Sequence, residues 1–342
     1  MYMSDATPAL FPAMRAARLP PGKPLLLVVV DTEEEFDWGA PFDRAATAVT
    51  AVPGQALAQD IFRPHGLRPT YVIDYPIAST ASSVEYFRAL LDRNECQIGT
   101  HLHPWVTPPH DEIVSDRNSY PGNLPSALEH AKLSVMTETI TRNFGVRPTM
   151  YKAGRYGLGP ATATSLASLG YRIDLSALVH TDLRPIHGPD YRGTPDRPFW
   201  FGDDLFEVPM TRGFFGALAG VGARLYPRTR SAIGQRARLP GILSRARLLE
   251  RATLTPEGTD LAAAQRLVRA MRKQGHRVFS LTYHSPSLAI GHTPYVRTEQ
   301  DLERFLAMIR QFTDWFFGAF GGSPTTPEEV RALAETAVPA LD

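Results

Sequence analysis

Two histidines, two residues apart, are the residues of this sequence best placed to do chemistry. His101 and His103 stand in Gly-Thr-His-Leu-His-Pro-Trp, directly after an apolar, strand-like run. Because side chains alternate between the two faces of a strand, both imidazoles point the same way at the strand's end. Two neutral nitrogen donors placed in this way need one carboxylate to complete a three-ligand metal site.

A pair of acids ends an earlier strand-like run. The aliphatic stretch Leu25–Val30 leads into Asp-Thr-Glu, and the same alternation puts Asp31 and Glu33 on one face. Paired acids at one strand end and paired histidines at another are the parts of a metal-assisted hydrolase. Glu34 and Glu35 follow directly, so the sequence does not show whether Glu33 or a neighbouring acid is the carboxylate ligand.

The donor set indicates the kind of metal. Mixed nitrogen and oxygen donors with open positions favour Zn²⁺, with Co²⁺, Mn²⁺ or Fe²⁺ as substitutes. His110, beyond two prolines, is a less favoured replacement for His101 or His103.

Apolar runs alternate with helical patterns along the chain, as a parallel sheet covered by helices requires. Seven strands are predicted: Leu25–Asp31, Thr70–Asp74, Cys96–His103, Thr149–Ala153, Arg172–Ser176, Leu205–Met210 and Val278–His284. Helices are predicted at Val84–Asp92, Leu124–Phe144, Pro160–Leu169, Asp260–Gln274 and Thr298–Phe317. This order favours an α/β fold, a seven-stranded parallel barrel. The reactive residues fall at C-terminal strand ends, where such barrels carry their active sites.

Composition bounds the remaining possibilities. The chain has 342 residues, 43% hydrophobic content and a net charge of +1, so no overall field suggests a nucleic-acid partner. Its single cysteine cannot form an internal disulfide, and no apolar window approaches the roughly 18 residues of a transmembrane helix. Residues 1–23 contain no apolar leader. We therefore expect a cytoplasmic protein, with a peripheral position at the inner membrane as an alternative.

The segment from Arg212 to Arg251 has the most unusual composition, with nine arginines and one acid, Glu250. A basic amphipathic insertion can rest on an anionic membrane or bind a phosphorylated carrier, and it can also be a solvated excursion over the barrel. We expect a single barrel over residues 24–320 with this basic insertion at about 212–258. An N-terminal extension (1–23) and a C-terminal tail (321–342) would flank it.

Five motifs, in order along the chain, resemble those of the polysaccharide deacetylase family. They are Val-Val-Asp31-Thr-Glu33, Ile-Gly-Thr-His101-Leu-His103-Pro, Tyr-Lys152-Ala-Gly-Arg155-Tyr-Gly, Ile-Asp174-Leu-Ser176 and Leu-Thr-Tyr-His284-Ser-Pro. This family, carbohydrate esterase family 4, shares the NodB-homology domain, and the chain looks closest to its cell-wall and lipopolysaccharide-locus, WalW-like branch. The resemblance covers roughly residues 24–290. It implies an irregular seven-stranded barrel and a divalent metal, usually zinc, used to remove acetyl groups from sugars.

The resemblance also implies roles for single residues. Asp31 would be the general base, and Glu33, His101 and His103 the metal ligands, although the common family pattern spaces its histidines four residues apart. The family usually places an arginine in the third of these motifs, where it holds the base ionised. Lys152 stands at that position here and Arg155 follows three residues later. We favour Arg155, since only a guanidinium offers a planar fork.

The acid side of the reaction would consist of His284 and Asp174. His284 would protonate the departing amine, and Asp174 would hydrogen-bond the other ring nitrogen and raise the imidazole pKa. His292 is an alternative acid. Leu288 would line the pocket for the acetyl methyl group, and Trp105 and Tyr156 would contact the sugar. Trp38 and Trp200 are further aromatic residues predicted near the mouth, where they could equally pack loops onto the barrel.

These assignments predict a metal-dependent hydrolase that removes an acetyl group from a sugar of a bacterial surface polysaccharide or its lipid- or nucleotide-linked precursor. Three alternatives remain open. A hydrolase of a non-sugar C–N bond could use the same metal and barrel. A glycosidase would need two carboxylates and would leave the paired histidines without a purpose. A catalytically impaired glycan-binding module would account for the altered histidine spacing and for Lys152.

Overall fold

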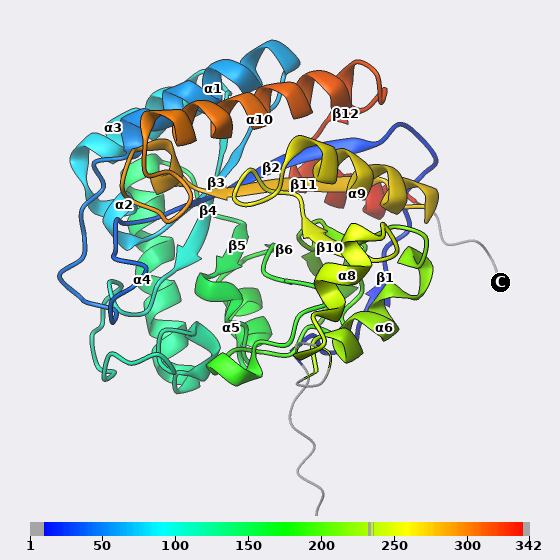
Figure 1. Ribbon diagram of the computed structural model, residues 1–342. Coiled ribbons are helices and arrows are strands. Elements are labelled where there is room, and N and C mark those ends of the chain that lie inside the picture. Colours follow the sequence, from blue (N-terminus) through cyan, green and yellow to red (C-terminus); the bar gives the residue numbers. More distant parts are fainter. Residues whose placement is uncertain (1–9, 232–233, 235, 338–342) are drawn as a thin grey trace, which may run out of the picture.

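The protein, described as a computed structural model, is an α/β fold built on a curled parallel sheet (Figure 1). The structure describes residues 10–337 apart from 232, 233 and 235. Within these residues, seven parallel strands lie in the order β8-β6-β5-β4-β3-β2-β11. They are β2 (Leu25–Thr32), β3 (Thr70–Ile73), β4 (Gln97–Leu102), β5 (Met150–Ala153), β6 (Ile173–Asp174), β8 (Leu205–Glu207) and β11 (Val278–His284). All seven predicted strands are confirmed, although β6 and β8 are shorter than predicted.

The two edges of the parallel sheet, β8 and β11, do not pair with each other in the described chain. The β8 edge continues through the antiparallel strands β7 (Phe199–Phe201) and β1 (Arg15–Ala16). The β11 edge is held by two hydrogen bonds to the chain beside it: Ser280 N donates to Thr211 Oγ1 (2.7 Å) and Thr282 N to Leu254 O (3.2 Å). The barrel is therefore irregular and only partly closed.

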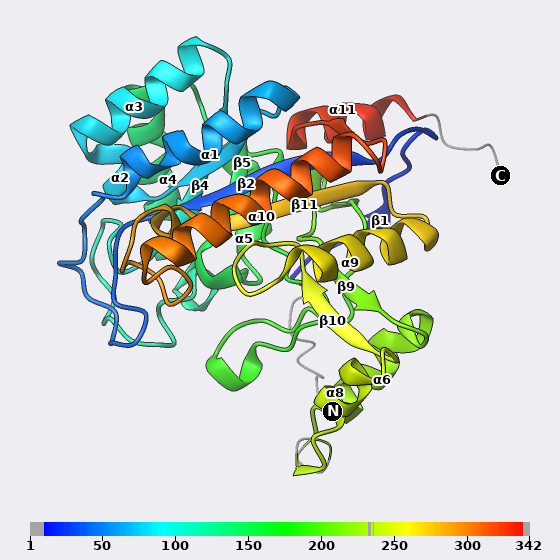
Figure 2. The same ribbon diagram turned by 45° about the horizontal axis from the view of Figure 1, so that its top comes forward.

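Helices cover the outer face of the sheet, and α1 lies beside α10 there (Figure 2). The five predicted helices are confirmed as α3 (Ala81–Asp92), α4 (Ser126–Phe144), α5 (Thr162–Ser168), α9 (Leu261–Lys273) and α10 (Glu299–Phe317). Helices not predicted are α1 (Gln55–Phe62), α2 (Tyr75–Ser79), α6 (Gly222–Thr229), α8 (Leu239–Arg245) and α11 (Pro327–Thr336). None of the described helices combines the length and hydropathy needed to cross a bilayer.

Alternation along β2 divides its buried side chains between two apolar clusters. Leu26, Val28 and Val30 pack with the outer helices. The alternate residues Leu25, Leu27 and Val29 form the inner row with side chains from neighbouring strands. Because both faces are buried, this strand is a continuous aliphatic run in the sequence. The inner row leads directly to Asp31, which follows Val29 on the same face.

The C-terminal residues close the apolar end of the inner face. In place of the predicted tail, the chain forms β12 (Ser323–Pro324), which pairs with β2, and then α11. Val330 and Ala334 of α11 are buried in the inner cluster, so an exposed tail would leave that cluster uncovered. The described part of the predicted N-terminal extension also packs on the barrel, where Phe11 contacts the rings of Phe199 and Phe201.

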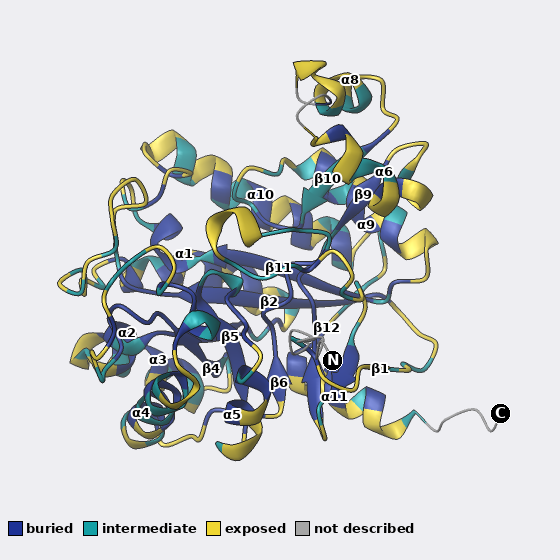
Figure 3. Ribbon diagram, turned by 90° about the horizontal axis from the view of Figure 1, so that it is seen from below, coloured by how far each residue is buried: buried dark blue, intermediate teal, exposed yellow. Residues whose placement is uncertain are grey.

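The basic insertion is a two-stranded ribbon that carries helices at its far end. Strand β9 (Arg212–Phe215) pairs antiparallel with β10 (Glu250–Thr253), and α6 and α8 lie between them in the chain. In Figure 3 the far end of the insertion, at α8, stands away from the barrel, and much of α8 is exposed. The extent of the insertion as a separate unit, about 212–258, stays a prediction.

Candidate metal and catalytic site

The candidate site lies on the inner face, at the C-terminal ends of the strands. Asp31 and His284 are register partners on β2 and β11, and His101 and Lys152 are register partners on β4 and β5. Register partners in a sheet share a face, so the four side chains continue the inner apolar rows beneath them. The fold thereby gathers these groups from four strands above one apolar core.

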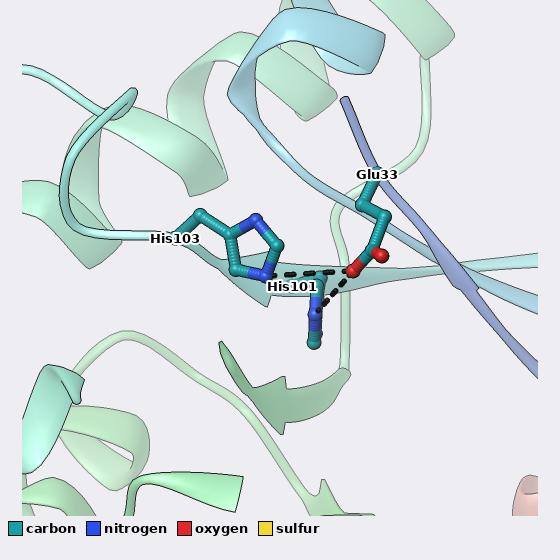
Figure 4. Close-up of side chains that lie close together, drawn as sticks. All are labelled: Glu33, His101 and His103. Carbon is teal, nitrogen blue, oxygen red and sulfur yellow. Dashed lines mark ion pairs between the residues drawn. The ribbon is translucent and has the colours of Figure 1, made fainter. Parts of the chain in front are cut away.

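Three buried side chains that the sequence offered as metal ligands, Glu33, His101 and His103, lie close together in the structure (Figure 4). Glu33 Oε2 lies 3.6 Å from His101 Nε2 and 3.5 Å from His103 Nε2, and one ligand atom from each residue lies within 4.8 Å of the others. Glu33 Oε1 is buried and has no hydrogen-bond partner among the described residues. Two imidazole nitrogens beside a carboxylate with one unsatisfied oxygen are a donor set that fits a divalent cation.

Both imidazoles are oriented through their other ring nitrogen. His101 Nδ1 is 2.9 Å from Lys152 O, and His103 Nδ1 is 2.7 Å from Glu34 Oε2. The remaining Glu34 oxygen accepts a hydrogen bond from Trp105 Nε1 (2.7 Å). Such partners hold metal-binding histidines in place, and here they turn both Nε2 atoms toward Glu33.

These contacts separate Glu34 from the ligand set. Glu34, Asp74 and His103 also lie close enough to hold a cation. Asp74, however, accepts hydrogen bonds from the backbone of Glu34 (2.7 Å) and, as the cap of α2, from Ile77 (2.9 Å). Burial raises the pKa of Glu34 to about 8 and that of Asp74 well above its usual range. This group therefore supports His103, and Glu33 is the acid that faces both histidines.

Asp31 forms a buried ion pair with Lys152. Lys152 Nζ lies 2.5 Å from Asp31 Oδ1 and 2.7 Å from Oδ2, and it also donates to Thr282 Oγ1 at 3.4 Å. Burial on its own would raise the pKa of Asp31, but the cationic Lys152, followed by His101 and His284, lowers that pKa below its usual value. Asp31 is therefore a carboxylate at neutral pH.

The cation that serves Asp31 is Lys152, and the prediction that Arg155 serves it is wrong. Arg155 and Tyr156 both have positive φ angles, 54° and 61°, so the chain leaves the strand direction directly after β5. The Arg155 guanidinium lies over the rings of Tyr120 (4.3 Å) and Phe42 (4.9 Å) and donates to Ser119 Oγ. Arg155 therefore forms part of a cavity wall above the site.

His284 is oriented by Glu257, a residue that the sequence did not indicate. His284 Nδ1 is 2.8 Å from Glu257 Oε2, and its backbone N donates to Glu257 Oε1 (3.0 Å). The other ring nitrogen, Nε2, lies 3.7 Å from Asp31 Oδ2. Burial disfavours the charged ring, but the neighbouring acids, with Glu257 first, raise the pKa of His284 to about 10. The ring of His284 is therefore a doubly protonated, positively charged imidazolium at neutral pH.

The prediction that Asp174 hydrogen-bonds His284 is wrong. Ile173 belongs to the inner row of the sheet, so the next residue, Asp174, points to the opposite face. There Asp174 accepts a hydrogen bond from Ser176 Oγ (2.5 Å) and lies opposite Glu207 of β8. Burial raises the pKa of Asp174 to about 6.

A cavity of about 340 Å³ opens above the site. Besides Asp31, Glu33, His101, His103 and His284, its walls include Phe36, Trp38, Phe42, Tyr120, Arg155, Tyr156, Leu183, Ile186 and Tyr295. Tyr156 lies in this wall as predicted for a sugar contact, and the Trp38 ring meets the His284 ring edge-on at 5.0 Å. The cavity is therefore lined mainly by aromatic and ionisable side chains.

Three other residues predicted at the mouth lie elsewhere. Leu288 is buried in the outer apolar cluster and does not line the cavity. Trp105 is buried behind His103, with the two rings stacked at 4.2 Å. Trp200 lies on β7 between the guanidinium groups of Arg15 and Arg331. These side chains were misplaced because spacing in the sequence does not show which face a loop or edge strand turns inward.

Neither a family model nor a curated protein sequence matches this chain. Among solved structures, a protein provisionally assigned as a polysaccharide deacetylase, from Mycobacterium smegmatis, has a TM-score of 0.51 and 17% identity, with 97% of this chain and 100% of that chain covered. A 4-alpha-glucanotransferase from Thermococcus litoralis has a TM-score of 0.50 and 10% identity, covering 91% of this chain and 40% of that one.

A family 4 carbohydrate esterase from Streptomyces lividans, solved in complex with acetate, has a TM-score of 0.40 and 12% identity and covers 87% of this chain and 90% of its own. The Mycobacterium smegmatis structure, with a TM-score of 0.51, shares the fold of this chain, and an identity of 17% shows nothing beyond the fold. The predicted fold class, an irregular parallel (β/α) barrel of the NodB-homology type, is confirmed.

Proposed function

We propose that this protein is a metal-dependent hydrolase that removes an acetyl group, preferably N-acetyl, from a sugar. One observation carries the proposal. A buried Glu33–His101–His103 donor set, an ionised Asp31 and a protonated His284 all line a single cavity. The likeness in fold to a polysaccharide deacetylase supports a sugar as the substrate. Membership of the WalW-like branch, with its surface-polysaccharide context, stays a prediction.

The chain's own residues divide the work of the reaction. Glu33, His101 and His103 would hold the metal, which when bound acts as a Lewis acid and makes water a better nucleophile. Asp31 accepts a proton from the attacking water, and Lys152 holds the carboxylate in place. His284 donates its proton to the departing nitrogen while Glu257 holds the ring. One water is consumed, and acetate and a free amino sugar are released.

The direct test combines metal analysis with an assay of acetate release. Purified protein is expected to hold about one equivalent of a transition metal and to release acetate from at least one acetylated sugar, offered free, lipid-linked or nucleotide-linked. Chelation should stop the release, and added metal should restore it. Metal binding without acetate release from any of these sugars would instead favour the glycan-binding alternative, and release of formate or ammonia from a non-sugar amide would favour the other hydrolase.

Replacing Glu257 with Gln is expected to move the alkaline limb of the pH–rate profile to lower pH. The general acid must be protonated, so activity falls as pH rises through the pKa of His284. Among the groups that raise this pKa, Glu257 has the largest effect, and its carboxylate lies 2.8 Å from the ring. Removing an opposite charge at hydrogen-bond distance lowers the pKa of a histidine by roughly 1–3. Measuring kcat/KM across pH 5–11 checks the shift. Glu250→Gln, in the insertion, serves as the charge-matched control, and an unmoved limb in Glu257→Gln would show that His284 is not the acid.

We also propose that the insertion contacts an anionic membrane surface. A cavity of about 620 Å³ between the insertion and α9 is lined by one acid, Glu250, and by five cations. The cations are Arg245, Arg247, Arg266, Arg269 and Lys273, and none of them forms an ion pair with another described residue. Large apolar side chains are also exposed in the insertion, at Leu218, Val221, Leu239, Ile242 and Leu248. Cations that surround exposed apolar groups are typical of surfaces that bind anionic lipid.

Replacing Arg266 and Arg269 with Ser is expected to weaken binding to vesicles of anionic lipid. Each cation near such a surface contributes about 1 kcal/mol, so the double variant should bind roughly tenfold or more weakly at low salt. Cosedimentation with anionic and with neutral vesicles measures the effect. Arg88→Ser/Arg142→Ser, on exposed faces of α3 and α4, provides a control of equal charge. Absence of anionic-vesicle binding by the parent protein would refute the membrane contact.

A further inference from the structure

The β9–β10 ribbon turns one face toward α9 and carries two arginines on the other face. Gly213 and Phe215 turn toward α9, where the position of a Gly213 Cβ would lie 3.1 Å from Met271 Sδ. The register pairs Arg212 with Thr253 and Phe214 with Arg251. Because side chains alternate along each strand, Arg212 and Arg251 share the other face and are diagonal neighbours, roughly 7–8 Å apart.

Neither guanidinium on this face is neutralised by an acid. Arg212 Nη1 donates to Thr253 Oγ1 (3.1 Å), while Arg212 Nε is buried without a hydrogen-bond partner. Arg251 Nη1 donates to His180 O (2.7 Å), and its guanidinium lies 4.6 Å from the centre of the Tyr226 ring. No carboxylate among the described residues lies within ion-pair distance of either arginine. The remaining donors have no carboxylate partner among the residues that the structure describes.

Two neighbouring cations in a partly buried position destabilise a protein unless an anion balances them. Burial, and then the charge of Arg251, lower the pKa of Arg212 to about 10. Guanidinium groups present planar forks of donors that match the oxygens of phosphate. Two such forks on one face suit a group with several anionic oxygens, such as a phosphate or a diphosphate, better than a single carboxylate.

Short chain segments connect the contacts of the arginine pair to the catalytic site. Burial raises the pKa of Tyr156, which lines that cavity, and the charge of Arg212 acts on the same hydroxyl in the opposite direction. Thr253, which accepts the Arg212 hydrogen bond, precedes Glu257 by four residues, a span of at most about 14 Å. His180, whose carbonyl Arg251 holds, comes three residues before Leu183 in the cavity wall.

We propose that Arg212 and Arg251 bind a phosphate group of the substrate while its acetylated sugar occupies the catalytic cavity. The substrate class would then be a sugar joined to a phosphate or diphosphate, carried either by a nucleoside or by a lipid. This inference rests on the proposed hydrolase function, because it assigns the substrate of the same site. It also assigns a specific task to two arginines at the base of the insertion.

Titration calorimetry with inorganic pyrophosphate tests the site directly. The full-length protein is first stripped of metal, because pyrophosphate also binds metal ions. We expect saturable binding at one site, weakened roughly tenfold or more in Arg212→Gln and in Arg251→Gln, since each change removes a charge-assisted hydrogen bond. Arg224→Gln, exposed on α6, makes the same change in net charge and should bind like the parent. No saturable binding at millimolar pyrophosphate, or equal loss in Arg224→Gln, would overturn the inference.

A misfolded variant is recognised by its melting temperature, and Arg212→Lys then replaces Arg212→Gln. Lysine keeps the charge but lacks the fork, so it should bind more weakly than the parent and more tightly than any neutral variant that folds. Binding equal to that of the parent in both Arg212→Lys and Arg251→Gln would refute the assignment.

Two further ligands identify the carrier. A nucleoside diphosphate and an isoprenoid diphosphate are titrated separately, and the one that binds more tightly than pyrophosphate has the carrier's chemistry. If pyrophosphate binds but both organic diphosphates are excluded, the site does not hold a substrate phosphate. These measurements need neither metal nor turnover, so they separate the two proposals. Phosphate binding without acetate release refutes the hydrolase, and acetate release without phosphate binding refutes this site.

Discussion

His101→Ala and His103→Ala are each expected to abolish metal retention. Each imidazole is one of three protein donors around the site, with Nε2 within 3.6 Å of Glu33 Oε2. Loss of a residue that merely orients a ligand lowers metal affinity by about 10–100-fold, so loss of a ligand itself should exceed that range. Elemental analysis after gel filtration measures the metal that remains, and acetate release should fall with it.

Two further variants make this result specific. His110→Ala removes an exposed histidine that the sequence offered as an alternative ligand, and it should keep the full metal content. Glu34→Gln keeps all three donors but weakens the hold on His103, so it should lose metal only at low metal concentration. Circular dichroism confirms that each variant is folded. Stoichiometric metal in a folded His101→Ala or His103→Ala variant would show that the ligand assignment is wrong.

Asp31→Asn is expected to keep the metal and lose most of the turnover. Asp31 lies next to the three metal donors, and its ion pair with Lys152 keeps its carboxylate ionised. The amide of Asn cannot accept the proton of the attacking water. Proton transfer by a positioned base contributes about 10²–10⁴-fold to a rate. We therefore expect kcat to fall by that factor, measured as initial acetate release at saturating substrate and full metal occupancy.

The same substitution leaves Lys152 as a buried cation without a counter-charge, which costs about 3–5 kcal/mol of stability. The double variant Asp31→Asn/Lys152→Met removes that charge as well, so its melting temperature should recover while its activity stays low. Asp92→Asn, at an exposed helix end, controls for the chemical change alone. If the folded, metal-loaded Asp31→Asn protein turns over like the parent, Asp31 is not the base.

The strands were predicted well because each is short, contains apolar residues and is buried on both faces. Asp31, Glu33, His101 and His103 all follow such runs directly. Within each pair, the two side chains share a face because of alternation along one strand, and this can be predicted without knowing which strands pair with it. The C-terminal ends of parallel strands meet at one edge of the sheet, which is why the two pairs come together.

Residues beyond the strand ends were assigned less well. Lys152 belongs to the inner row of β5, whereas Arg155 lies beyond the end of that strand. Arg155 and Tyr156 both have left-handed backbone conformation, and the chain turns there so that Arg155 lies in the cavity wall. Asp174 was matched to His284 by its motif, although its neighbour Ile173 occupies the inner face and turns Asp174 to the other side. The face of so short a strand is set by its pairing with β5 and β8, which is a property of the assembled sheet.

Glu257 and the arginine pair show most clearly what depends on tertiary structure. The sequence by itself determined the order of strands, the acids and histidines at their ends, and the basic character of the insertion. Only the folded chain brought Glu257 to His284, 27 residues further along, and placed Arg212 and Arg251 on one face of a ribbon. Local patterns specify which face of an element a side chain occupies. Contacts between loops and strands depend on how all the elements pack, because no periodic signal in the chain encodes the distance between two distant segments.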